Sequence, residues 1–168
     1  FSSLGLIIPG QVSTLVILLT AVFILLYSAD TLYSFRGKSA RAETIEHWET
    51  KTPFLPAKTN ELPLYFILCV CAGVFEEIIY RGFFIVYCQH LFASYNYPDM
   101  WAVTVPALVF SIAHIYQGHK AVFKILLLSF LFGLICYYSQ SLLIVVILHF
   151  LVDWTGGLLN LRLNKKNK

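Results

Sequence analysis

The sequence predicts an all-α protein, a polytopic transmembrane helix bundle with about five spans. Two observations indicate this fold class. Of the 168 residues, 58% are hydrophobic and only 12% are charged, and the mean hydropathy is +0.73, whereas soluble domains carry about 25% charged residues. The apolar residues also gather in runs long enough to cross a bilayer, which takes roughly 17–25 residues for a helix.

The apolar runs divide the chain into five candidate spans, of which the third and the fifth are short or interrupted. They lie at about 4–28, 62–91, 99–114, 122–138 and 141–159. We therefore expect a single membrane-embedded domain over 1–168, with its chemistry in a core over 62–160.

The segment 29–60 is expected to be a cytoplasmic loop that contains an amphipathic helix. It holds most of the soluble charge, and Pro53 and Pro56 break any helix before the second span. The first span lacks a basic segment before it and a small-residue cleavage site, so it does not read as a cleaved signal. Because the sequence begins at Phe1, further helices upstream are left open.

Lys and Arg residues alternate between the two sides of the predicted bundle. They gather in 36–58, at the start of the fourth span and in the C-terminal tail, whereas 92–98 and 138–141 hold none. The positive-inside rule then puts the N-terminus outside and the C-terminus in the cytoplasm. A net charge of +3 gives no reason to expect a nucleic-acid partner.

The second span carries three charges in an otherwise apolar run, namely Glu76, Glu77 and Arg81. Each charge near a bilayer centre costs at least ~2.5–3.5 kcal/mol, so such residues are by default a functional site. Glu77 and Arg81 are four residues apart, the favourable order for an intrahelical ion pair. Glu76 is turned about 100° away and has no local partner.

Two further spans each carry a histidine that lies one helical turn from a second residue of interest. Phe110 and His114 end the third span, and His149 and Asp153 lie in the fifth. If these helices meet in one bundle, Glu76 would be joined by two histidines and a second carboxylate. Such a set suits water activation, with a carboxylate base and donors for an oxyanion.

These residues resemble the motifs of the CAAX-processing and bacteriocin-processing (CPBP) family of glutamate-type intramembrane proteases, related to the type II CAAX prenyl endopeptidases. The matching motifs are Glu76-Glu77-x-x-x-Arg81, Phe110-x-x-x-His114 and His149-x-x-x-Asp153. The resemblance covers roughly 62–160. It implies an all-helical membrane fold and peptide hydrolysis with no metal and no cofactor.

The resemblance also implies roles for single residues. Glu76 and His114 would polarise the attacking water, and His149 with the residue at 153 would stabilise the oxyanion. The prenyl endopeptidases have Asn at the last position, whereas this chain has Asp153. An ionised Asp only accepts hydrogen bonds, so we expect Asp153 to orient His149 instead.

The remaining motif residues are expected to support the site rather than to react. Glu77 and Arg81 would hold it in shape, together with Phe110. The cysteines, Cys69, Cys71, Cys88 and Cys136, all fall within predicted spans and show no ligand spacing. They are expected to be free apolar thiols.

Two other readings stay open at this point. Glu76, His114 and His149 would also supply three zinc ligands with an open fourth position, as in a metalloprotease, although the chain lacks HExxH. From a different class comes a non-catalytic membrane protein, either a bacteriocin-immunity or partner-binding factor or a small transporter that relays protons. Close approach of Glu76, His114 and His149 to one water would distinguish a protease from the non-catalytic membrane protein.

We therefore expect a glutamate-dependent, metal-independent intramembrane endopeptidase in the cell membrane of a prokaryote. Its partners would be the lipid bilayer and a peptide or protein substrate in or at the membrane. The small size favours a leader peptide, bacteriocin precursor, signalling peptide or sorting tail over a prenylated CAAX protein. The oligomeric state, the bond cleaved and any need for prenylation are not predicted.

Overall fold

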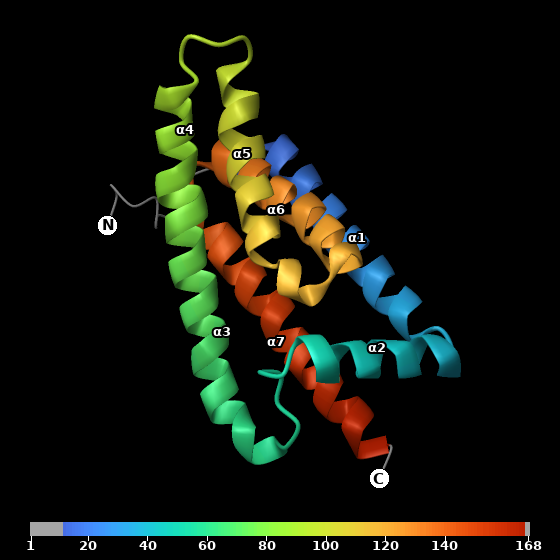
Figure 1. Ribbon diagram of the computed structural model, residues 1–168. Coiled ribbons are helices and arrows are strands. Elements are labelled where there is room, and N and C mark those ends of the chain that lie inside the picture. The colour runs from blue at the N-terminus through green and yellow to red at the C-terminus, as the bar shows by residue number, and fades with distance from the viewer. Residues whose placement is uncertain (1–11, 167–168) are drawn as a thin grey trace.

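The computed structural model describes residues 12–166 and is helical there apart from short connections (Figure 1). The helices follow one another as α1 Thr14–Phe35, α2 Lys38–Lys51, the 3-10 turn Thr59–Glu61, α3 Leu62–Glu77, the π-helix Ile78–Phe84, α4 Ile85–Leu91, α5 Pro98–Ala113, the 3-10 turn Ile115–Gln117, α6 His119–Ser139 and α7 Leu142–Lys166. The predicted all-α bundle is confirmed.

Four helical runs within the described residues are long and apolar enough to cross a membrane. They are Thr14–Phe35, Thr59–Leu91, His119–Ser139 and Leu142–Leu163, and the apolar α5 is shorter. The protein is an integral membrane protein, with four such runs plus a shorter apolar helix in place of five equal spans. The third predicted span is the one that proves short.

The first span lies further along the chain than predicted. α1 begins after Ser13, whose hydroxyl accepts a hydrogen bond from the Val16 N–H at 3.3 Å, and it continues to Phe35. The predicted span 4–28 therefore falls partly on residues 1–11, outside the described residues. Residues 29–35, expected to open the loop, continue α1 instead, because nothing before Gly37 breaks the helix.

α2 is a polar helix that lies across one end of the bundle (Figure 1). Its buried apolar residue is Ile45, and its Trp48 ring meets the Phe35 ring of α1 edge-on, with 5.9 Å between the ring centres. After Pro53, the Glu61 carboxylate accepts hydrogen bonds from backbone N–H groups that lead the chain into α3. The predicted segment 29–60 thus contains a helix, but this helix is polar and buries little apolar surface, whereas an amphipathic helix was expected.

α3, the π-helix and α4 form one continuous rod over 62–91, the predicted second span (Figure 1). Its middle, Ile78–Phe84, has π-helical hydrogen bonding. Wider turns of this kind occur mostly as short insertions within α-helices and often lie at functional sites. Here the π-helix directly follows Glu77 and contains Arg81.

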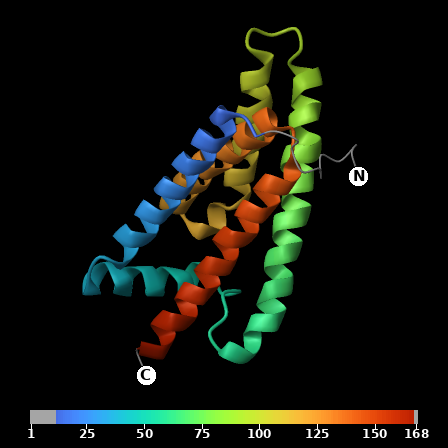
Figure 2. The ribbon, with the colours of Figure 1, turned by 180° about the vertical axis from the view of Figure 1, so that it is seen from behind.

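α7 crosses the bundle between α1 and α3, as the reverse view shows (Figure 2). The face of α3 that meets α7 carries Tyr65, Cys69, Gly73 and Glu77, spaced four residues apart and all buried. At Gly73 an added Cβ would lie 3.3 Å from two backbone atoms of α7. The glycine therefore sets how closely the two helices approach.

α5 and α6 pack closely on the other side of the rod. A Cβ at Gly133 of α6 would lie 2.7 Å from the Val103 side chain of α5, so only glycine fits there. The first turn of α6 also reaches α2, where Lys120 pairs with Glu43 at 3.8 Å. The basic segments around α2 and at the start of α6 therefore share one end of the bundle, as predicted, while the compartment that this end faces stays a prediction.

Candidate active site

The site is built on a buried ion pair at the junction of α3 and the π-helix. Arg81 donates from Nη1 to Oε1 of Glu77 at 2.8 Å, and the side chains are 2% and 0% exposed. Its Nη2 donates to the Ser129 hydroxyl of α6 at 2.7 Å and to the Ser129 carbonyl at 3.1 Å. The predicted pair between Glu77 and Arg81 is thus present, and it ties α3 to α6.

His149 of α7 is held by the same carboxylate. Its Nδ1 lies 2.7 Å from Oε1 of Glu77. Because an ionised carboxylate only accepts hydrogen bonds, Nδ1 carries a hydrogen and Nε2 points to the opposite side. Asp153, expected to orient this ring, instead lies 3.6 Å from Nε2 through Oδ2, outside hydrogen-bond range. The orienting role therefore belongs to Glu77.

Two carboxylates flank the free side of this imidazole. Oε2 of Glu76 lies 3.8 Å from Nε2 of His149. The Glu76 side chain is 35% exposed and the Asp153 side chain is 30% exposed. Both separations lie just beyond direct hydrogen-bond range but within the range of an ion pair. Glu76, His149 and Asp153 therefore converge, although they come from α3 and α7.

His114 reaches this cluster through Phe110. It ends α5, and its Nδ1 lies 2.8 Å from the Phe110 carbonyl, so Nδ1 donates and Nε2 is left as an acceptor. The Phe110 ring packs on His114 at 4.5 Å, on His149 at 6.1 Å and under the Arg81 guanidinium at 4.9 Å.

A comparison with known families covers the region that holds these residues. The model of the type II CAAX prenyl endopeptidase Rce1-like family matches residues 58–155, more than half of the chain and the whole region that holds the site. The chain belongs to the Rce1-like family. Neither the comparison with curated proteins nor the comparison with solved structures gave a match.

Membership in the Rce1-like family supports an intramembrane CAAX protease activity in general, with a protein substrate at the membrane. The matched region begins just before α3 and ends in α7, so it excludes α1 and α2. The residues that the sequence singled out in α3, α5 and α7 all lie within it. Around the His149 ring lie Glu76, Glu77 and Asp153, with Phe110 beside them and His114 against Phe110.

Sequence reasoning missed the supports of the site in this Rce1-like protein. Ser129 fixes Arg81, and Tyr65 donates to the Asp153 carbonyl at 2.7 Å. Tyr27 donates to the Val152 carbonyl at 3.2 Å. The available signal was a lone serine in an apolar run, since a polar side chain in a span needs a partner. The tyrosines carried no such signal, because aromatic residues are common in spans.

The described residues do not form a metal centre. Among 12–166 there is no group of three His, Cys, Asp or Glu side chains close enough together to hold a metal ion. The zinc set considered from sequence, Glu76, His114 and His149, is thus not assembled as a ligand set here. The cysteines are free, as expected, and three of them are buried.

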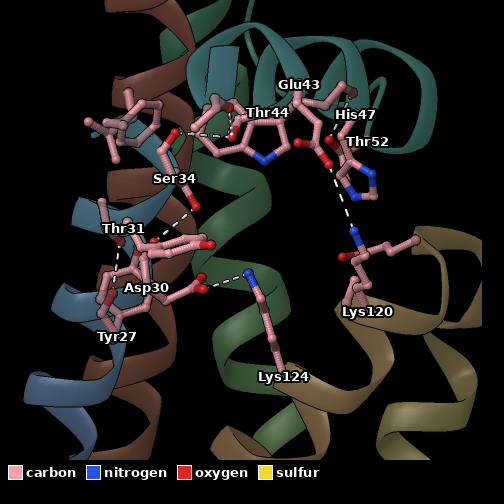
Figure 3. A pocket seen from close by; sticks show the side chains of 18 of the residues that line it. Tyr27, Asp30, Thr31, Ser34, Glu43, Thr44, His47, Thr52, Lys120 and Lys124 are labelled. Carbon is pink, nitrogen blue, oxygen red and sulfur yellow. Dashed lines mark hydrogen bonds and ion pairs between the residues drawn. The ribbon is translucent and has the colours of Figure 1, made fainter. Parts of the chain in front are cut away.

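A hollow lined by other residues lies apart from this cluster, and Figure 3 shows it from close by. It is a cavity of about 490 Å³ between α1, α2, α6 and α7. Two ion pairs cross it, from Lys124 to Asp30 and from Lys120 to Glu43. The predicted site residues lie outside its lining, which reaches α7 at Gly156 and Leu159.

Proposed function

We propose that this protein is a glutamate-dependent, metal-independent intramembrane endopeptidase that hydrolyses a peptide bond in a membrane-associated or lipidated substrate. The observation that carries the proposal is the position of Glu76. Its carboxylate is accessible and faces the Nε2 side of His149, while Glu77 and Arg81 hold that ring from the other side. Family membership supports the reaction class.

In the proposed reaction Glu76 accepts a proton from water, and the water oxygen attacks the scissile carbonyl carbon. His114, with Nε2 as an acceptor, helps to polarise the water. His149 donates from Nε2 to the resulting oxyanion, which requires a doubly protonated ring because Nδ1 is bonded to Glu77. Collapse of the intermediate breaks the C–N bond, and the proton held by Glu76 passes to the leaving amine.

In this scheme Asp153 is a second carboxylate beside the doubly protonated ring. It lies 3.6 Å from Nε2 and stabilises the positive charge that oxyanion stabilisation requires. The role of Asp153 is therefore electrostatic, whereas Glu77 sets the orientation of the ring.

Adjacent glutamates offer a matched test. Glu76→Gln should abolish cleavage, a loss of at least about 100-fold for a general base, while the purified protein keeps its thermal midpoint. Glu77→Gln should lower the midpoint, since this side chain is fully buried and bonded to Arg81. Near-normal turnover by Glu76→Gln in a detergent or proteoliposome assay would refute the mechanism.

The proposed protonation states predict a bell-shaped pH dependence of kcat/KM. Activity should fall on the acid side as Glu76 becomes protonated, and on the alkaline side as His149 loses its Nε2 proton. The acid limb should be absent from any residual activity of Glu76→Gln. A profile that rises steadily with pH would contradict donation from His149.

Chelation distinguishes this mechanism from the zinc alternative. A zinc enzyme would use the metal to lower the pKa of bound water to ~7, and phenanthroline would abolish its activity. We expect activity to persist in phenanthroline and elemental analysis to find no stoichiometric zinc. One zinc per active chain, with loss on chelation and recovery on zinc addition, would favour the metalloprotease.

The substrate is proposed by class only. A leader peptide, bacteriocin precursor, signalling peptide or sorting tail suits a prokaryotic membrane enzyme whose C-terminus faces the cytoplasm. Comparing membrane and secreted peptides from cells with wild-type or Glu76→Gln protein should reveal peptides that depend on activity. If both strains yield the same peptides and no purified substrate is cleaved, the non-catalytic immunity or partner-binding reading is favoured.

A further inference from the structure

Two tyrosines from different helices donate hydrogen bonds to consecutive carbonyls of α7. Tyr27 of α1 donates to the Val152 carbonyl at 3.2 Å, and Tyr65 of α3 donates to the Asp153 carbonyl at 2.7 Å. Within an α-helix each of these carbonyls already accepts the N–H four residues further on. Each tyrosine thus adds a second hydrogen bond to a carbonyl of α7 beside the candidate site.

The N–H groups that these carbonyls accept belong to a pair of glycines. Gly156 and Gly157 lie within α7 shortly after Asp153. Glycine in a helix interior destabilises the helix by roughly 0.5–1 kcal/mol relative to Ala. Gly157 is the one of the two in contact with Tyr65: a Cβ there would overlap Cε1 of the Tyr65 ring, whereas a Cβ at Gly156 would meet nothing within 4 Å. The Tyr65 ring therefore occupies the space that a side chain at 157 would need.

Tyr65 and Glu77 lie on the same buried face of α3, and both contact α7. Glu77 holds the His149 ring, and Tyr65 holds the backbone of Asp153 one turn further along. Each residue of an α-helix is rotated by about 100° from the next. A partial roll of α7 about its axis would therefore carry His149 and Asp153 together away from Glu76.

We infer that Tyr65 is a positioning residue for the candidate active site: its hydroxyl, on the Asp153 carbonyl, fixes the rotation of α7 so that His149 and Asp153 face Glu76. The inference rests on the proposed function. Tyr65 itself is 4% exposed, and its hydroxyl bonds to the backbone of Asp153. It acts through α7.

The first test removes the hydroxyl and keeps the ring. Tyr65→Phe should lower kcat by about tenfold to 100-fold with KM within about twofold of wild type, since a misplacement of ~1 Å at a catalytic group costs about that much. The thermal midpoint should change little, and the limbs of the pH profile should move. Tyr33→Phe, which removes an exposed hydroxyl bonded to Arg36, is the control and should match wild type.

The second test uses the neighbouring glycines. Gly157→Ala puts a methyl group into the Tyr65 ring and should reproduce the loss of kcat, whereas Gly156→Ala meets open space and should keep wild-type activity. Both substitutions add the same methyl group to the same helix, so a difference between them reports the contact with Tyr65. Equal activity of the two alanine variants would overturn the inference.

Failure of this inference is distinguishable from failure of the proposed function. If wild type is active and Glu76→Gln is not, the glutamate mechanism stands whatever Tyr65→Phe does. A Tyr65→Phe variant with unchanged kcat and pH profile then refutes only the positioning role. A parallel fall of kcat and thermal midpoint with an unmoved pH profile would also refute it, because that pattern indicates a structural role.

Discussion

Removing Arg81 should cost more stability than any other single truncation at the site. Its guanidinium is 2% exposed and makes three hydrogen bonds, one to Glu77 and two to Ser129. Oε2 of Glu77 is buried with no hydrogen-bond partner among the described residues, so this carboxylate depends on the donors at Oε1. Arg81→Ala leaves the charge of Glu77 uncompensated, which typically destabilises by ~3–5 kcal/mol.

The size of this effect can be checked by thermal unfolding in detergent. For a protein of this size 1 kcal/mol shifts the midpoint by roughly 2–4 °C, so Arg81→Ala should lower it by roughly 6–20 °C. Ser129→Ala removes one bond and leaves the Ser129 carbonyl in place, so its cost should not exceed about 1.5–3 kcal/mol. Arg81→Ala should also reduce expression and activity.

A double variant separates the loss of the bonds from the exposure of a buried charge. Glu77→Gln combined with Arg81→Met removes both charges, and replacing a buried ion pair with neutral groups of similar volume is often nearly neutral. The double variant should therefore recover at least half of the stability lost in Arg81→Ala. A stable, well-expressed Arg81→Ala protein that has lost only its chemistry would refute the reasoning.

Two further predictions concern packing and orientation. Gly73→Val should separate α3 from α7 and reduce kcat by about 100-fold, because a Cβ at this position lies 3.3 Å from backbone atoms of α7. Gly82→Ala should retain activity, because the nearest atom to its Cβ, at 3.1 Å, is the end of a leucine side chain that can move. Assays on both variants at equal expression decide this. In a background without native cysteines, a cysteine at Asn96 should react with an impermeant thiol reagent from outside and one at Lys166 should not; the opposite labelling would reverse the predicted topology.

The fold followed from the sequence where local physics decides the outcome. The lengths of the apolar runs predicted the rod over 62–91 and the last two spans to within a few residues, because a bilayer demands a fixed helix length. The i, i+4 spacing likewise predicted the pair of Glu77 and Arg81, which is contained in one helix. The start of α1 was misplaced because apolar residues extend on both sides of Ser13 and hydropathy does not mark a cap.

The details that could not be predicted depend on contacts between helices. Sequence spacing favoured Asp153 as the group that orients His149, since the two lie one turn apart on α7. The structure gives that role to Glu77, because the approach of α3 to α7 puts Oε1 at 2.7 Å from Nδ1. Ser129 was missed for the same reason: its partner lies on another helix.

The π-helix at Ile78–Phe84 makes the length of the second span as important as its composition. A one-residue deletion in this segment would leave its hydropathy almost unchanged and would let the rod continue as a regular α-helix. Because a π-helical turn holds about one residue more than an α-helical turn, a deletion after Arg81 would leave α4 facing α5 in nearly its present orientation. The same deletion within the regular turns of α3 would rotate everything after it by about 100°, so a deletion scan should find α3 intolerant of shortening and 82–84 the stretch of the rod that accepts it.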